Sequence, residues 1–143
     1  MSQSITIQTT VNAPVAKVWD YWTKPEHITH WAFASDDWEA PRAENDLRVG
    51  GTFVTVMAAK DKSTSFDFNG TYTAVEPMQV IEYDMQKAES EAVARHVKTV
   101  FAATPEGTHI TETFDMESQN SEEKQRSGWQ AILDNFKKYV EAN

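Results

Sequence analysis

The stretch that decides the fold is the last one, residues 121–141, SEEKQRSGWQAILDNFKKYVE. Its large apolar residues recur at i, i+3, i+4, i+7 and i+11, a spacing that places them on one face of an α-helix. These residues are Trp129, Ile132, Leu133, Phe136 and Val140. A helix of about 20 residues with such a stripe is not stable alone in water. The sequence therefore predicts a long amphipathic helix that lies on a broad apolar surface.

Both ends of this helix carry sequence signals. Asn120 or Ser121 can cap its N-terminus, and Glu123 stands three residues after Asn120, as in a capping box. Lys137 and Lys138 lie near the C-terminal end, where the helix dipole favours positive charge. We therefore expect one continuous helix across the whole stretch.

Composition limits the class of protein. The chain of 143 residues suits one domain, residues 1–143, and it has no cysteine, which excludes disulfides, thiolate catalysis and cysteine-based zinc sites. The first ten residues lack the pattern of a signal peptide, and no apolar run reaches membrane-spanning length. A net charge of -9 repels nucleic-acid phosphates and anionic lipid surfaces. We expect a cytoplasmic protein, a monomer or weak homodimer, with no nucleic-acid partner and no membrane span.

The N-terminal third reads as a strand followed by two short helices. Apolar residues alternate with polar ones from Ile5 to Val11, which predicts a strand with one buried face. Pro14 favours a helix start, and the apolar stripe of that helix is Val15, Val18, Trp19 and Trp22. Pro25 ends the first helix and opens a second one that reaches Trp31. Residues 32–46 show no period and predict a loop anchored by Trp38.

From Leu47 the apolar period returns to two. The alternation predicts strands over residues 47–57, 66–74, 80–85, 93–103 and 108–116. Gly50 and Gly51 interrupt the first of these, where we expect a bulge or a close backbone approach. Residues 58–65 and 76–79 read as turns, and residues 86–92 as an acidic exposed segment.

Two hairpins fix the register of the later strands. If Val75 pairs with Val80, Tyr72 faces Tyr83 and Ala74 faces Ile81, so the two apolar rows share one face. The turn at residues 104–107 predicts a second hairpin, in which a bulge at Gly107 would shift the register by one. Its predicted pairs are Ala103 with Thr108, Phe101 with Ile110, Thr99 with Glu112, Val97 with Phe114 and Arg95 with Met116.

The order of elements predicts an α+β fold. Successive strands without crossover helices form an antiparallel sheet of six or seven strands, strongly curved, with two short helices after the first strand. The long C-terminal helix crosses the concave face. A wide apolar helix laid across a bent sheet encloses space, so we expect a cavity between the two.

Several motifs resemble a known family. Residues 11–19 (VNAPVAKVW), 22–31 (WTKPEHITHW), 47–53 (LRVGGTF), 69–77 (NGTYTAVEP) and Gly128-Trp129 followed by Leu133 closely resemble the bacterial branch of the activator of Hsp90 ATPase homologue family. That family is part of the START and Bet v 1-like superfamily, and the likeness covers essentially the whole chain. The resemblance implies a helix-grip fold. It brings no family-wide catalytic residues, because the superfamily includes lipid carriers, hormone receptors, cyclases and dioxygenase subunits.

Glu112 is the only catalytic candidate. It stands in an otherwise apolar row with Ile110, Phe114 and Met116, where a buried carboxyl would have a raised pKa and serve as acid, base or ligand acceptor. The alternative is that Glu112 lies at the rim or pairs with an inward Arg95, since charges are seldom buried without a partner.

Histidine does not predict a metal site. His27 and His30 are three residues apart, near Asp36, Asp37 and Glu39, but no third ligand has a defined spacing. We therefore interpret them as surface residues. His96 and His109 take outward parity in their strands and are expected to be ordinary exposed side chains. We predict neither a metal nor a cofactor.

Aromatic residues are the strongest functional signal. Rings from the helical pair, the inward strand rows and the long helix surround the expected cavity, with a few polar groups to orient a guest. The predicted ligand-binding residues are Trp22, Trp31, Phe33, Trp38, Phe53, Phe66, Phe68, Tyr72, Tyr83, Thr99, Glu112, Phe114, Trp129, Leu133 and Phe136.

Three functions from different classes follow. The first is a carrier or sensor that binds a small hydrophobic or aromatic molecule without converting it. The second is a cyclase-like or hydrolase-like enzyme with Glu112 and a tyrosine as acid and base. The third is a protein-interaction module directed at a chaperone, which the family resemblance implies. The eukaryotic family members use an additional N-terminal domain for chaperone stimulation, for which this chain has no room, so we favour the first.

Overall fold

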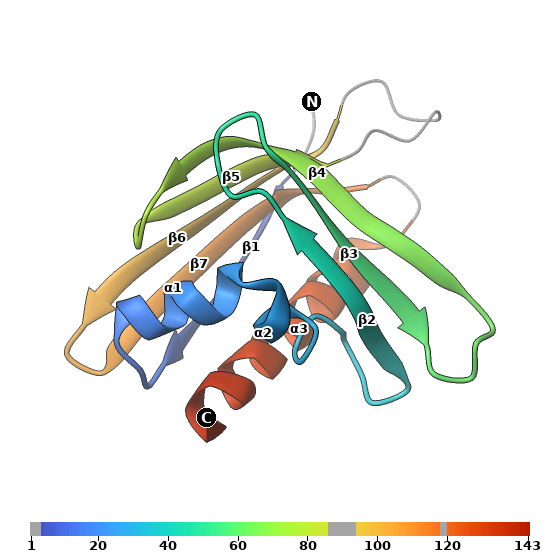
Figure 1. Cartoon of the computed structure of the whole chain (residues 1–143), viewed down its shortest axis with the longest axis horizontal. Helices are drawn as coiled ribbons and strands as arrows, with labels where there is room; N and C mark the ends of the chain where they lie inside the picture. Colours follow the sequence, from blue (N-terminus) through green and yellow to red (C-terminus); the bar gives the residue numbers. More distant parts are fainter. Residues whose placement is uncertain (1–3, 86–93, 118–119) are drawn as a thin grey trace.

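The structure, a computed structural model, describes residues 4–85, 94–117 and 120–143. One antiparallel sheet curls around a long C-terminal helix, as Figure 1 shows. The helices are α1 (Val15–Thr23), α2 (Pro25–Ile28) and α3 (Glu122–Ala142). The strands are β1 (Ser4–Val11), β2 (Trp38–Asn45), β3 (Thr52–Ala59), β4 (Ser65–Glu76), β5 (Val80–Met85), β6 (His96–Thr104) and β7 (Gly107–Asp115).

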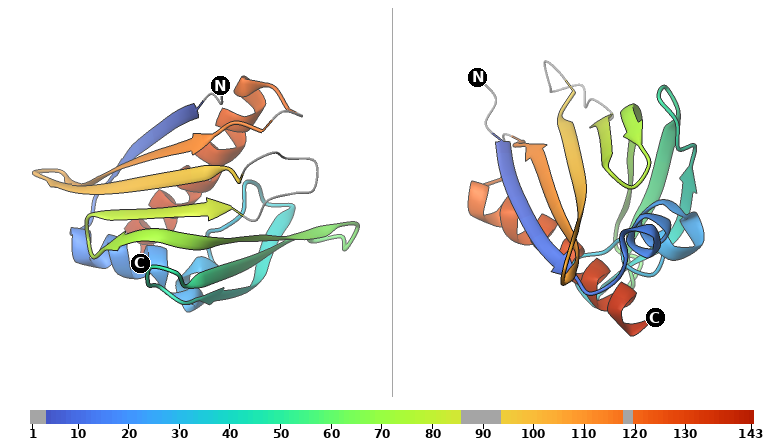
Figure 2. Two further views of the ribbon diagram at one scale, coloured as in Figure 1. Left: turned by 90° about the horizontal axis from the view of Figure 1, so that it is seen from above. Right: turned by 90° about the vertical axis from the view of Figure 1, so that its left-hand side faces the viewer.

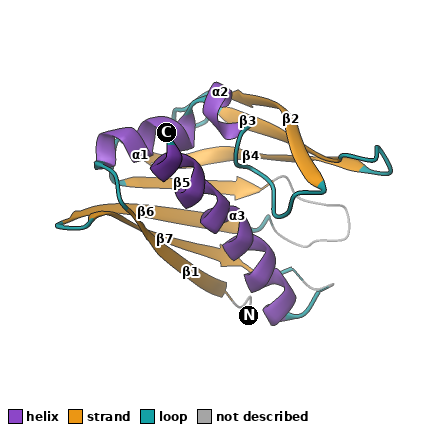
Figure 3. Cartoon of the chain, turned by 90° about the horizontal axis from the view of Figure 1, so that it is seen from below, coloured by secondary structure: helices purple, strands orange, loops and turns teal. Residues whose placement is uncertain are grey.

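The sheet has the order β1-β7-β6-β5-β4-β3-β2, so β1 and β2 form its two edges. It bends into a half-barrel, and α3 crosses the open side with α1 and α2 beside it (Figures 2 and 3). This is the predicted helix-grip architecture, and its α+β class is confirmed. The predicted acidic segment at residues 86–92 lies outside the described residues.

The sheet has seven strands, within the predicted six or seven, but the position of β2 was not predicted. Residues 38–45, interpreted as part of a loop, form β2 and pair with β3. Their alternation is hidden because β2 is an edge strand with charged side chains, and because its register shifts between Glu39 and Arg42. Pro41 lies at this shift, which is where a sheet tolerates a residue without an amide proton.

One strand boundary and one strand register were predicted wrongly. Residues 47–49 are not part of a strand, because β3 begins only at Thr52. They lead into a turn in which Gly50 has a φ of +84°. The predicted close backbone approach is present, because a Cβ at Gly51 would lie 2.1 Å from the Asp46 carbonyl oxygen. In the first hairpin Tyr72 does face Tyr83, but the register then shifts.

That shift lies between Tyr72 and Ala74, so Val75, and not Ala74, pairs with Ile81. The second hairpin forms without a bulge. Its pairs are Ala103 with Thr108, Phe101 with Ile110, Thr99 with Glu112 and Val97 with Phe114, as predicted. Along β7, buried inward positions alternate with half-buried outward ones.

Helix α3 begins where the sequence predicted. The hydroxyl of Ser121 accepts a hydrogen bond from the Lys124 amide, which caps the N-terminus. Leu133, Phe136 and Val140 of the predicted stripe are buried. Trp129 and Ile132 pack against the same core while partly exposed.

The polar flank of α3 covers the edge strand β1. Arg126 donates to the carbonyl of Thr6 at 2.8 Å, and Lys137 donates to the carbonyl of Thr10 at 2.6 Å. The amide of Asn12 donates to the Glu141 carboxylate at 2.8 Å. These bonds occupy backbone groups that an edge strand would otherwise offer to another chain. They also fix the helix close to β1, which determines where space remains.

Candidate ligand-binding cavity

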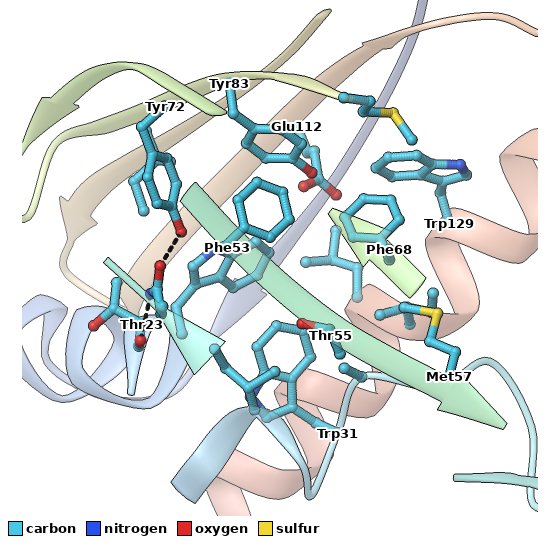
Figure 4. A pocket seen from close by; sticks show the side chains of 18 of the residues that line it. Thr23, Trp31, Phe53, Thr55, Met57, Phe68, Tyr72, Tyr83, Glu112 and Trp129 are labelled. Carbon is cyan, nitrogen blue, oxygen red and sulfur yellow. Dashed lines mark hydrogen bonds between the residues drawn. The ribbon is translucent and has the colours of Figure 1, made fainter. Parts of the chain in front are cut away.

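A cavity of about 340 Å³ lies between the concave face of the sheet and α3. This volume is at the lower end of the range for small-molecule pockets. Apolar and aromatic side chains form most of its wall, as Figure 4 shows. The lining residues are Trp22, Thr23, Ile28, Trp31, Ala32, Asn45, Phe53, Thr55, Met57, Phe66, Phe68, Tyr72, Ile81, Tyr83, Met85, Arg95, Glu112, Glu117, Trp129, Ile132 and Leu133.

The aromatic wall is braced by contacts between rings. Phe53 packs edge-on against Tyr83 with centroids 4.7 Å apart, and Phe68 packs against Trp129 of α3 at 5.9 Å. Edge-to-face contacts at these distances are favourable for aromatic pairs. The wall therefore keeps its shape through ring contacts across β3, β4, β5 and α3.

Glu112 projects into the cavity from β7 and is only 6 % exposed. Its Oε2 accepts a hydrogen bond from the Thr99 hydroxyl at 3.1 Å. Burial raises the pKa of Glu112 to about 7, although the Thr99 hydrogen bond acts in the opposite direction. The rim interpretation was therefore wrong. Arg95 lines the same cavity.

Two tyrosines place hydroxyl groups near the wall. Tyr72 donates to Asn45 Oδ1 at 2.5 Å, and Asn45 donates in turn to the carbonyl of Thr23 at 2.7 Å, which ties β4 and β2 to α1. Burial raises the pKa of Tyr83, and the nearby Glu112 charge raises it further. Both phenols therefore stay protonated at neutral pH and can act as hydrogen-bond donors.

Most of the predicted ligand-binding residues line this cavity. They are Trp22, Trp31, Phe53, Phe66, Phe68, Tyr72, Tyr83, Glu112, Trp129 and Leu133. Phe66 is the most exposed of them, with half of its surface open to solvent. Whether any of these residues binds a ligand stays a prediction.

Five predicted residues lie behind the wall or beside it. Phe136 packs under Trp22 and Trp31 with centroids 4.9 and 4.8 Å away. Phe114 stacks on Trp129 at 4.0 Å. These rings support lining residues and do not reach the space. The others are Phe33, in the surrounding core, Trp38, which packs on Phe66, and Thr99, which holds Glu112.

The sequence analysis did not predict the lining residues that are not aromatic, apart from Glu112 and Leu133. Thr55 and Met57 belong to the same inward row as Phe53, but both faces of β3 are partly apolar, so alternation alone does not indicate which row faces the cavity. Asn45 was missed because β2 was not recognised as a strand. The remaining missed residues are Thr23, Ile28, Ala32, Ile81, Met85, Arg95, Glu117 and Ile132.

The histidines of the helical pair make more side-chain contacts than predicted. His27 stacks on Tyr21 with centroids 3.9 Å apart and hydrogen-bonds the Tyr139 hydroxyl at 2.8 Å, while His30 stacks on Tyr139. In the described part of the chain, no three His, Asp or Glu side chains are grouped to hold a metal ion.

The outward strand histidines differ from each other. His96 contacts Asp84 at 2.7 Å and Glu82 at 2.9 Å. Partial burial lowers the pKa of His96, but hydrogen bonds and charges from these carboxylates outweigh it and raise the pKa above its usual value. His109 hydrogen-bonds Thr10 and Gln8 of β1. His96 is therefore not an ordinary exposed side chain.

Comparisons with known proteins agree with this architecture. The AHSA1-like protein from Aeromonas hydrophila, solved in solution, shares 42 % identity with a TM-score of 0.89, over 98 % of this chain and 93 % of that one. Chr148 from Cytophaga hutchinsonii shares 49 % identity with a TM-score of 0.81, again over 98 % of this chain and 93 % of that one.

More distant structures show that the fold tolerates large sequence change. CV1439 from Chromobacterium violaceum has 20 % identity and a TM-score of 0.86, with 98 % of each chain covered. No curated protein matches the chain.

Across the described ranges, no helix combines the length and the apolar character needed to cross a lipid bilayer.

The family described as "Activator of Hsp90 ATPase homolog 1-like protein" matches residues 12–141. The chain therefore belongs to this family.

Proposed function

We propose that this protein binds one small hydrophobic or aromatic molecule in the cavity between α3 and the sheet, as a carrier or sensor. The observation that carries the proposal is a largely apolar cavity of about 340 Å³, which the aromatic residues of the domain surround and do not fill. Protein interiors are normally packed with few voids larger than a water molecule. A void of this size with few polar groups is typical of a ligand site.

The experiment fills the cavity and measures binding of an uncharged fluorescent aromatic probe, N-phenyl-1-naphthylamine. Thr55 is 7 % exposed and faces the cavity from β3, so Thr55→Trp places a large ring inside it. We expect one probe molecule per wild-type chain and at least about a tenfold weaker affinity for the variant. Probe binding also changes the fluorescence of Trp22, Trp31 and Trp129, which line the cavity.

The matched control is Val54→Trp, which adds the same ring to the other face of the same strand. Val54 does not line the cavity, so probe affinity should stay at the wild-type value. Circular dichroism and thermal unfolding check that both variants fold. Equal loss of binding in both variants, or no binding by the folded wild-type protein, would contradict the proposal.

A second candidate function is acid–base catalysis on a bound hydrophobic ester. It is favoured by one observation, the pKa of about 7 for Glu112 in the cavity wall, because a general base works best when its pKa lies near the working pH. Glu112 would take the proton from the attacking water. Hydrolysis of 2-naphthyl acetate should then rise with pH around 7 and fall to the buffer rate in Glu112→Gln. A rate equal to buffer in the wild-type protein would remove this candidate.

A further inference from the structure

The cavity wall carries two polar atoms for which the described residues provide no hydrogen-bond partner. Glu112 uses Oε2 to accept from Thr99, while its Oε1 has no hydrogen-bond partner among the described residues. The Tyr83 hydroxyl, from the neighbouring part of the wall on β5, also has none in the described chain. Neither atom is sealed away from open space, since both residues line the cavity.

These two atoms lie close to each other. Figure 4 shows the Tyr83 ring extending toward the Glu112 carboxyl, and the two groups are near enough for the carboxylate charge to raise the pKa of the phenol. No hydrogen bond joins them among the described residues. Both atoms face the cavity, so a guest molecule that excludes water there must bond them or leave them unsatisfied at a cost in free energy.

The two atoms together specify the polar group of the guest. Tyr83 presents an O–H donor, and the carboxylate of Glu112 presents an acceptor. A hydroxyl group accepts the first bond through its oxygen and donates the second through its proton. A bond to the charged carboxylate is the stronger one. Much of the surrounding wall is ring surface from residues such as Phe53, Phe68 and Trp129.

We propose that the ligand is a small, uncharged aromatic alcohol or phenol whose hydroxyl group bonds Tyr83 and Glu112 while its rings fill the aromatic part of the cavity. This inference rests on the proposed function and gives its ligand class. The volume of about 340 Å³ suits a molecule of a few rings.

The charged and polar groups around Glu112 determine which other classes of guest the experiment must compare. Arg95 and Glu117 line the same cavity, Tyr83 and Tyr72 face it from β5 and β4, and Thr99 bonds Glu112 from β6. A cationic guest would pair with Glu112, and an anionic guest would be repelled by Glu112 and Glu117. The proposed hydroxyl ligand carries no charge of its own, so the probe series must include neutral, cationic and anionic compounds.

The experiment compares 2-naphthol with 2-methylnaphthalene, which has nearly the same shape and no hydroxyl. Affinities are measured by tryptophan fluorescence for the wild-type protein and for the double variant Tyr83→Phe with Glu112→Leu. The double variant removes both polar atoms and keeps the wall filled. We expect the ratio of the two affinities to shift by at least about tenfold toward 2-methylnaphthalene in the double variant.

The control is Tyr21→Phe, which removes a tyrosine hydroxyl outside the cavity and should leave the ratio unchanged. Thermal unfolding confirms that each variant folds; should the double variant fail, Tyr83→Phe alone gives the same test with a smaller shift. An unchanged ratio in folded variants would overturn the inference. Tighter binding of 2-naphthoate or 2-naphthylmethylammonium than of 2-naphthol would also overturn it, in favour of an ionic partner. If no probe binds, the proposed function fails as well.

Discussion

The two halves of the space under α3 differ in packing. Beside β1, β7 and β6 the interior is solid: Val11, Val18, Phe136 and Val140 are all fully buried. Beside β3, β4 and β5 the interior is hollow, and Phe68 borders open space. Both halves are built from large apolar side chains. The difference comes from α3, which packs closely against β1 and contacts β3, β4 and β5 much less.

This contrast shows that a cavity does not require small residues. The hollow half contains many of the largest side chains of the protein, held apart by contacts between rings on different strands. A change in the solid half should therefore cost stability, while the same change in the hollow half should mainly alter binding.

The largest expected effect comes from matched phenylalanine truncations. Phe136→Ala in the solid half removes a ring that contacts Trp22 and Trp31, and it should lower the free energy of unfolding by about 3–5 kcal/mol. Phe68→Ala removes a half-buried ring beside the cavity and should cost less than half of that, because fewer contacts are lost. Urea denaturation measures both. Equal losses would mean that the two halves are packed alike.

The next effect is the pH dependence caused by Glu112. Its folded-state pKa of about 7 lies above the usual 4.5, so between these values the folded protein holds a proton that the unfolded chain has released. The contribution of this group to stability therefore falls as the pH rises from about 4.5 to about 7 and is constant above that. The full loss is about 3 kcal/mol.

The test of this effect is Glu112→Gln, which keeps a partner for Thr99 and cannot ionise. The variant should be more stable than wild type at pH 8 by up to about 3 kcal/mol, and the difference should vanish near pH 4. Comparing the two proteins cancels the contribution of His96, whose raised pKa also makes stability fall as the pH rises and which is present in both. A stability difference that does not change with pH would show that Glu112 is not buried in its charged form.

A smaller effect separates buried hydrogen bonds in the two halves. Thr108, fully buried in the solid half, donates to the carbonyl of Ala13 at 2.8 Å. Thr108→Val should cost about 1–3 kcal/mol, because water cannot replace the lost donor. Tyr72→Phe in the hollow half should cost less, because Asn45 lines the cavity and can bond water there. Thermal unfolding gives both values, and the reverse order would contradict the contrast.

The smallest effect is a stabilisation at Gly128 of α3. A Cβ there would meet nothing within 4 Å, so Gly128→Ala should stabilise the helix by about 1 kcal/mol. The matched control is Gly107→Ala, where φ is +138° and a Cβ would lie 2.1 Å from the Val11 carbonyl oxygen. That variant should be destabilised instead. Loss of stability at Gly128 would mean that α3 packs more tightly there.

The features that depend on local sequence were predicted better than those that depend on distant contacts. The alternation of apolar residues in β4 to β7 correctly predicted that Tyr72 faces Tyr83 and that Thr99 faces Glu112. Most of the predicted lining residues were identified from the same alternation. Strand β2 was missed, because charged side chains and a bulge at Pro41 remove the alternation from an edge strand. Because Asn45 belongs to β2, neither its position in the cavity wall nor its hydrogen bond with Tyr72 was predicted.

The sequence by itself determined the helices, the order of most strands and which residues of each strand face inward. It did so because the period of apolar residues reflects local backbone geometry. Only the tertiary structure decided which inward residues touch one another and which border empty space. That outcome depends on the curvature of the sheet and on the anchoring of α3 to β1, and no single segment carries either of them.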